Sequence, residues 1–215
     1  MGWTSSHAVY YKPDGQVDRK AECDAYFEEG LNRGYYKVLK SAMVGTVYYA
    51  AVKQLSRYSS KEENKMEKIP EKDQKIFGVV FLTSVNQKDY YNFSYKDIDE
   101  NMGPAEDLCP TSILNLLSNT DNEYAIEWRE KCRKNAEKQA TKRKAKRILD
   151  ELPVSSQITF VSEKNLSNGI KIRHTVYLMK AAYAGKTCWT DGQYRWSTAF
   201  IPDNFTIVYK PVKIN

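Results

Sequence analysis

The chain has 215 residues, with 33 lysines and arginines, 27 aspartates and glutamates, and a formal net charge of +6 at pH 7. This length suits one large domain, or a domain with a small module, and allows an ample core. No apolar run approaches the roughly 20 residues that a membrane-spanning helix needs, and the first residues lack the basic and apolar regions of a secretory signal peptide. The sequence therefore predicts a cytoplasmic protein with no membrane partner.

Four cysteines lie far apart in the chain, at Cys23, Cys109, Cys132 and Cys188. Zinc sites use ligands in close pairs such as CxxC, and the sequence has neither such a pair nor a cluster of histidines. We therefore expect four free, mostly buried thiols in a reducing compartment, with no metal and no other cofactor.

Residues 1–118 predict a mixed α/β domain. A strand over residues 3–11 leads to a turn over residues 13–15, and Asp18 then caps a helix of about 14 residues. Residues 35–55 are rich in β-branched and aromatic side chains. They predict extended structure with a bend at the central glycine, although their alanines leave part of the segment ambiguous.

A change in composition marks residues 59–75, which are mostly Lys, Glu, Asp and Ser. Such a segment buries too little apolar surface to offset the entropy of ordering, so we expect a mobile charged loop. A nearly apolar core strand, a strand paired with it as a hairpin, a loop and a short helix follow. They are expected over residues 76–85, 90–96, 97–109 and 110–117.

Residues 119–152 predict one long helix. Thr120 and Glu123 fit a capping box, in which a hydroxyl and a carboxylate each satisfy a free backbone N–H. The helix is expected to end at Leu152, because the following proline lacks an N–H. Apolar side chains repeat at i+4 near its start and are expected to pack on the first domain; they are Tyr124, Trp128 and Cys132.

The middle of this helix carries a concentrated positive charge. From Lys131 to Arg147 there are nine cations and one anion, a net charge of +8, so the rest of the chain sums to −2. Because residues 133–147 include no bulky apolar side chain, they are expected to lie in water on most sides. The candidate phosphate-binding residues are Lys134, Lys138, Lys142, Arg143, Lys144, Lys146 and Arg147.

Three interpretations of this charge remain open. The first is a solvated spacer helix that its lysines keep soluble, and the second is contact with a polyanion, with nucleic-acid phosphate as the leading candidate. The third is an acidic protein partner. A basic helix lying on a membrane is disfavoured, because that arrangement needs a bulky apolar face.

Residues 153–215 predict a small all-β module. Asn168-Gly169 and Asp191-Gly192 are typical of tight hairpin turns, and about five strands in so short a segment fit an SH3-like or OB-like barrel. The strands are expected over residues 157–166, 170–179, 186–190, 193–200 and 205–209. The whole chain is thus predicted to be α+β, with a mixed α/β domain, a long basic connecting helix and a small barrel-like β module.

Aromatic side chains of this module are candidates for stacking on nucleic-acid bases, since every base offers a π-face; the alternative is that they form the barrel core. They are Trp189, Tyr194 and Trp196. His174 alternates with apolar residues along a predicted strand, which favours a structural histidine that is either satisfied by its partners or partly buried.

Two sets of residues offer an enzymatic alternative. His7 and Cys23, with Glu22 or Asp24, form a conceivable nucleophile pair, but they lie on separate elements with no motif between them. An acidic cluster after a predicted strand has the residue types of a Mg²⁺-dependent nuclease, while acidic residues before Gly-Pro also form turns and caps. The cluster comprises Asp97, Asp99 and Glu100.

Several segments resemble a family of uncharacterised proteins of phages and mobile elements of gut Firmicutes; they are residues 1–8, 18–24, 40–45, 95–104 and 127–130. The resemblance covers residues 1–135 well and the final module loosely. It implies no known activity and no site residues. It implies a mobile-element setting in a bacterial host, where small accessory proteins often oppose host defences, as some type II anti-CRISPR inhibitors do.

The sequence thus predicts a non-enzymatic nucleic-acid-binding accessory protein that contacts the phosphate backbone of DNA or RNA through its basic helix. One alternative is an anti-defence inhibitor of the anti-CRISPR type that binds a host nucleoprotein enzyme directly. A second alternative is the Mg²⁺-dependent nuclease. The oligomeric state stays open.

Overall fold

The computed structural model describes residues 3–5, 10–29, 32–59, 65–83, 91–95, 107–167 and 169–212. They form a mixed α+β protein with one long helix and several β-sheets, as the sequence predicts. The chain divides into two compact units, residues 1–136 and 137–215. This division falls inside the long helix, α3 (Glu123–Glu151), whereas the sequence predicts a boundary at each of its ends.

The first unit is built on a five-stranded sheet in the order β1-β7-β6-β3-β2, with every neighbouring pair antiparallel. Its elements are β1 Trp3–Ser5, α1 Arg19–Glu28, β2 Tyr36–Val44, β3 Val47–Gln54, β4 Ser56–Tyr58, β5 Met66–Lys68, η2 Glu71–Asp73, β6 Ile76–Thr83, β7 Tyr91–Tyr95 and α2 Thr111–Leu114. Asp18 caps α1 as predicted, since its carboxylate accepts from the N–H of Ala21 at 3.0 Å.

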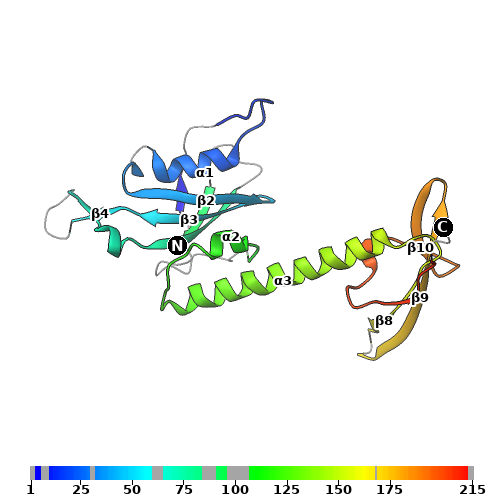
Figure 1. The fold of residues 1–215 in the computed structure, drawn as a ribbon. Helices are drawn as coiled ribbons and strands as arrows, with labels where there is room; N and C mark the ends of the chain where they lie inside the picture. Colours follow the sequence, from blue (N-terminus) through cyan, green and yellow to red (C-terminus); the bar gives the residue numbers. More distant parts are fainter. Residues whose placement is uncertain are drawn as a thin grey trace. The chain divides into compact units, whose positions relative to one another are not determined.

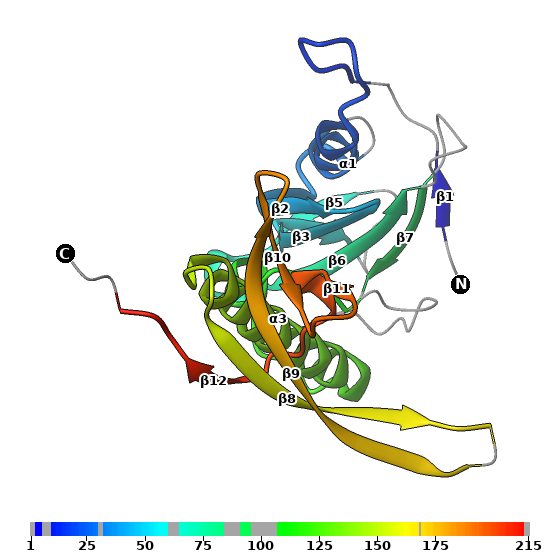
Figure 2. The same cartoon turned by 90° about the vertical axis from the view of Figure 1, so that its right-hand side faces the viewer.

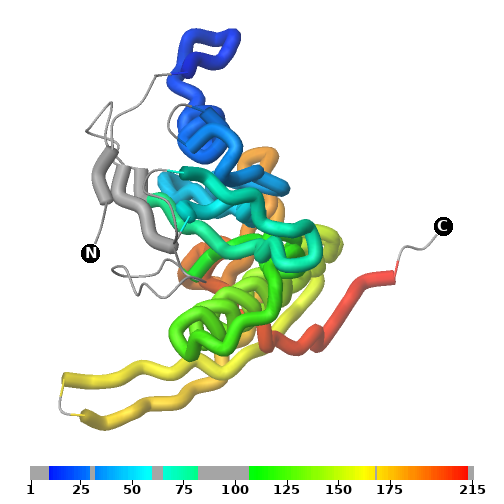
Figure 3. Tube along the Cα trace, turned by 90° about the vertical axis from the view of Figure 1, so that its left-hand side faces the viewer, coloured from blue at the N-terminus to red at the C-terminus, as the bar shows by residue number. Residues whose placement is uncertain are grey.

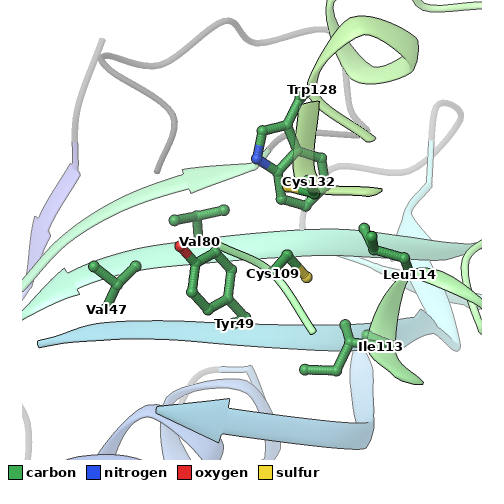
Figure 4. Packing of buried hydrophobic residues seen from close by; sticks show 9 residues of the cluster. Val47, Tyr49, Val80, Cys109, Ile113, Leu114, Trp128 and Cys132 are labelled. Carbon is green, nitrogen blue, oxygen red and sulfur yellow. The ribbon is translucent and has the colours of Figure 1, made fainter. Parts of the chain in front are cut away.

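Helices cover both faces of this sheet (Figure 1). On one face, Phe27 of α1 stacks on Phe81 of β6 with ring centroids 5.3 Å apart. On the other, Trp128 of α3 packs in a cluster with Tyr49 of β3 and with α2 (Figure 4). The first six residues of β3 are therefore buried on alternating sides. A strand covered on both faces reads as a continuous apolar run, and this explains the ambiguous pattern of its alanines.

The start of α3 differs from the prediction. The N–H of Ala125 donates to the side chain of Asn122 at 3.1 Å, while the Thr120 hydroxyl accepts from the N–H of Asn122 at 3.2 Å. Asn122 therefore caps the helix, and the predicted capping box of Thr120 with Glu123 is wrong. Asparagine caps a helix as well as serine does. The capping-box pattern that begins two residues earlier therefore predicts a helix start that is too early.

The buried face of α3 in the first unit also differs from the predicted stripe. Ala125, Trp128 and Cys132 are all at most 3% exposed, whereas Tyr124 is 63% exposed. The buried positions follow the i, i+3, i+7 spacing of one helix face. The prediction is confirmed for Trp128 and Cys132 and is wrong for Tyr124, because a strict i+4 stripe drifts around the helix.

Part of the segment predicted as a charged loop forms regular structure. Strand β5 pairs antiparallel with β4. Polar side chains add to this pairing: Glu67 lies 3.8 Å from the guanidinium of Arg57 and accepts from the Ser59 hydroxyl at 2.9 Å. Backbone pairing and these cross-strand contacts replace the apolar burial that the sequence lacks, which corrects the expectation of an irregular loop over residues 66–73.

Several sequence predictions fall on residues outside the described ranges. The second half of the predicted first strand (residues 6–9) and the end of the predicted first helix (30–31) are two of them. The others are the turn between β6 and β7 (84–90) and most of the loop before α2 (96–106).

The second unit contains the end of α3 and a five-stranded antiparallel sheet in the order β11-β10-β9-β8-β12. Its elements are β8 Gln157–Asn165, β9 Lys171–Tyr183, β10 Lys186–Thr190, β11 Arg195–Trp196, η3 Thr198–Phe200 and β12 Thr206–Tyr209. Strands β11 and β12 are the two edges, and no pairing among the described residues joins them. Closure into a barrel is therefore not shown.

Strands β8 and β9 form a long hairpin (Figures 2 and 3), and its outer part pairs with no third strand among the described residues. Ile170 and Ile172 there are 55% and 44% exposed. His174 shares their face, as the alternation predicts, but it is exposed. The expectation of partial burial is wrong, because the hairpin continues past the core that covers Val176 and Leu178.

The end of α3 is fixed by a lysine from the sheet. Lys180 of β9 is 5% exposed, and its ammonium donates to the backbone carbonyls of Leu149, Asp150 and Leu152 at 2.9, 2.8 and 2.7 Å. The first two carbonyls lie in the last turn of α3 and the third just beyond its end, where backbone carbonyls have no partner within the helix. Burial lowers the pKa of Lys180, and the nearby charge of Asp150 partly opposes that shift.

Replacing Lys180 by methionine tests this contact. The variant keeps an apolar stem but leaves buried carbonyls without donors, so the free energy of unfolding of the second unit should fall by about 3 kcal/mol. Hydrogen exchange of amides in β8, β9 and β10 measures that unit separately. Lys186→Met, on an exposed lysine of the same sheet, should change it by less than about 0.5 kcal/mol. Equal protection in both variants would contradict the role of Lys180.

Candidate nucleic-acid interface

The basic segment, residues 131–147 of α3, lies in water on most sides. Of its residues, Cys132 and Ala145 are buried, and Asn135 and Ala136 are half-buried. All seven candidate phosphate-binding residues are exposed, as the sequence predicts. The segment therefore presents its charge to solvent, and buried apolar side chains anchor the helix on either side of it, at Trp128 and Leu149.

Carboxylates of the same chain pair with three cations of the basic segment. Lys131 lies 2.6 Å from Glu127, Lys134 lies 4.0 Å from Glu130, and Arg147 lies 3.6 Å from Glu151, each at i,i+4. Exposed pairs of this kind contribute little to stability, because water and salt screen them. Five candidate residues have no carboxylate within 4.0 Å in the described part of the chain; they are Lys138, Lys142, Arg143, Lys144 and Lys146.

The exposed cations of the basic segment point in different directions around α3. A helix advances about 100° per residue, from 3.6 residues per turn. Lys138, Lys142 and Lys146 follow one another at i+4 and form one line along the helix. Arg143 and Arg147 form a second line, about a third of a turn away. A straight partner lying against one line therefore leaves the other in water.

The lysine line borders a groove within the second unit. Ala145 and Leu149 of α3 lie along it together with Lys142 and Lys146, and the segment over residues 198–203 forms the opposite wall. The groove holds about 450 Å³. Phe200 on that wall is 76% exposed. The sequence predicts Phe200 as the last residue of a strand and not as part of a site. The one feature of the sequence that could have drawn attention to it is an aromatic residue just before Ile201-Pro202.

The predicted stacking residues occupy different environments. Trp189 is 2% exposed and belongs to the core of the second unit. The prediction that it offers a surface for base stacking is therefore wrong. Trp196 is half-buried: its ring meets Phe160 edge-on at 6.0 Å, and its indole N–H donates to Asp191 at 3.1 Å. Of the three, Tyr194 keeps an open ring, with 66% of its surface exposed. The alternative of core packing holds for both tryptophans.

The proposed nucleophile is not activated. Cys23 is fully buried, and burial raises the pKa of its thiol, with the charges of Glu22 and Asp24 adding to the shift. The reactive form of cysteine is the thiolate, which this environment disfavours. Glu22 and Asp24 are instead engaged with Arg19 and Lys20 of the same helix at 3.0 and 2.6 Å. His7 lies outside the described residues.

The acidic cluster of Asp97, Asp99 and Glu100 also lies outside the described residues. Within the described ranges, no group of three or more His, Cys, Asp or Glu side chains is arranged to hold a metal ion. All four cysteines are free, and three of them are buried. Among the described helices, none combines the length and the apolar character that crossing a membrane requires.

Comparison with models of protein families, with curated proteins and with solved structures found no match. A function for the chain is therefore inferred from its own charges and geometry.

The hydrogen bonds in the turn between β10 and β11 predict that the stability of the fold depends on pH. Asp191 accepts from the backbone N–H groups of Tyr194 and Gln193 at 2.7 and 2.9 Å and from the Trp196 indole. These bonds, led by that of Tyr194, hold the pKa of Asp191 below its ordinary value of 3.8. A depressed carboxyl pKa stabilises the fold above the unfolded-state pKa, and this stabilisation is lost as pH falls through the folded-state pKa.

An NMR titration of the Trp196 indole N–H should therefore show a midpoint below pH 3.8. In Asp191→Asn the same signal should not titrate in this range, because the amide carries no acidic proton. A midpoint at or above the ordinary value would show that these bonds do not favour the charged form.

Proposed function

We propose that the protein binds nucleic acid without catalysing a reaction, through contacts between the phosphate backbone and the basic segment of α3. The observation that carries this proposal is the set of five exposed cations that have no carboxylate within 4.0 Å in the described part of the chain. They belong to a segment of net charge +8 on a chain of net charge +6. The protein is thus a nearly neutral body with one strongly positive helix.

The helix pays an electrostatic cost for this arrangement. Like charges at i,i+4 repel and destabilise an isolated helix, and the lines Lys138–Lys142–Lys146 and Arg143–Arg147 repeat that arrangement. A polyanion removes the repulsion and releases its own condensed counterions, which favours binding. The same lysines and arginines would suit a spacer helix only if solubility required them, and exposed carboxylates would serve that purpose as well.

Binding of this kind does not depend on sequence. Phosphate contacts position a protein on nucleic acid, while base-edge contacts in the grooves specify sequence. The five cations are lysines, which act as point charges, and a single arginine, Arg143. We therefore expect similar affinity for unrelated sequences and a steep dependence on salt concentration. The setting that the sequence resemblance implies, an accessory protein of a phage or mobile element inside a bacterial host, agrees with such a role.

Substituting Lys142, Arg143, Lys144 and Arg147 by glutamine tests the phosphate contacts. Each lost contact with duplex DNA should reduce the slope of log affinity against log salt by about 0.9, so affinity at low salt should fall by tenfold or more. The melting temperature should barely change, because all four side chains are exposed. Fluorescence anisotropy of labelled duplexes over a series of salt concentrations measures both quantities.

The matched control removes four positive charges elsewhere, from the exposed lysines Lys164, Lys171, Lys186 and Lys210. This variant has the same net charge as the helix variant but keeps the basic segment, so it should retain most of the affinity and the salt slope. An equal loss in both variants would reduce the effect to net charge. Unchanged binding by the helix variant would refute the proposal.

A further inference from the structure

The side chain of Phe200 is exposed to water although it is entirely apolar. Of its surface, 76% is exposed, although burying a side chain of this kind is one of the main sources of stability in a fold. Single exposed apolar residues are common. Phe200, however, stands on the wall of a groove whose other wall carries two lysines, and that combination calls for a ligand with both apolar and anionic parts.

The backbone around Phe200 holds this ring in place. Ser197 caps η3, and its hydroxyl oxygen accepts from the N–H of Ala199 at 3.3 Å. The N–H of Phe200 donates to the carbonyl of Ser197 at 3.0 Å. The next residue, Ile201, is 8% exposed and belongs to the core of the second unit. An anchored neighbour on one side and a capped turn on the other therefore present the ring to the groove.

The charges in the groove are arranged unevenly. Lys142 and Lys146 lie one turn apart on α3, about 6 Å along its axis, and neither has a carboxylate within 4.0 Å in the described ranges. Asp203, the acidic residue of the groove, comes from the segment that carries Phe200. A carboxylate repels phosphate but accepts hydrogen bonds from the amino groups of bases. The helix side of the groove thus suits phosphate, and the opposite side suits a base.

We infer that this groove binds unpaired nucleotides of a single-stranded nucleic acid, with a base stacked on Phe200 and the flanking phosphates at Lys142 and Lys146. This inference rests on the proposed function and adds to it a preference for single strands. The groove volume of about 450 Å³ lies within the range of small-ligand sites, roughly 300–1,000 Å³. Bases inside a duplex are stacked on each other, so only a single strand offers a free π-face to the ring.

The charges on the second line of α3 provide the matched control for this site. Lys142→Gln with Lys146→Gln and Arg143→Gln with Arg147→Gln each remove two charges from exposed positions of the same helix. The lysine pair borders the groove and the arginine pair does not. If the groove directs the strand, the lysine variant should weaken single-strand binding at least threefold more than the arginine variant. Equal losses would mean that charge alone attracts the ligand.

The main test compares Phe200→Ala with Tyr177→Ala in the full chain, using a single-stranded DNA, a single-stranded RNA and a DNA duplex of the same sequence. Tyr177 is 67% exposed on the sheet and lies outside the groove. The wild-type protein should bind at least one of the single strands tenfold or more tightly than the duplex at equal salt. Phe200→Ala should remove that preference while duplex affinity stays unchanged, and Phe200→Trp and Tyr177→Ala should retain it.

The outcomes separate the two proposals. Salt-dependent binding with no preference for single strands, or a preference that survives in Phe200→Ala, would overturn the groove and leave the phosphate contacts of α3 standing. Absence of binding to all three nucleic acids would refute the proposed function and the groove together. The DNA and RNA strands show which sugar the site accepts, and melting temperatures confirm that each variant is folded.

Discussion

The contact between Lys180 and the last carbonyls of α3 is the constraint on which the second unit depends. A helix that ends in a protein core brings carbonyls without partners into a place that water does not reach. Here one buried ammonium satisfies three of them, at Leu149, Asp150 and Leu152. Because Lys180 lies in β9, the helix and the sheet are joined at that point. Leu149 of α3 and Ile201, the residue after Phe200, pack in the same core, so the two walls of the groove are held together.

This contact also bears on the reason for the basic segment. Cations near a helix C-terminus often compensate the negative end of its dipole, and that role would explain positive charge without any partner. The last turn of α3, however, contains no basic residue of its own, and Lys180 from the sheet meets the dipole instead. The unpaired cations end before that turn, at Lys146. Compensation of the helix dipole therefore does not explain their charge in the described part of the chain, and this is why we propose an external anion.

Local signals in the sequence predicted most of the elements, and tertiary contacts decided the rest. The proline after Leu152 and the glycine turns mark the end of α3 and the hairpins because they act within a few residues. Whether Tyr124 or Ala125 faces the core depends on where α3 meets the sheet. His174 and Lys180 share one face of β9, yet one is exposed and the other is buried, because the core covers only the second half of the strand.

The candidate site, too, has one part that the sequence predicts and another that depends on tertiary contacts. Charge counting located the basic segment, since a net charge is a property of composition and needs no fold. Charge counting does not show in which direction each cation projects from the helix. Helical geometry shows that the cations form separate lines around α3. Phe200 could not be found from its neighbours in the sequence, because its significance comes from Lys142 and Lys146 on the other wall of the groove. If the proposed function holds, the composition alone predicts a general attraction for polyanions. The proposed preference for single strands depends instead on which line of cations the fold places beside an aromatic ring.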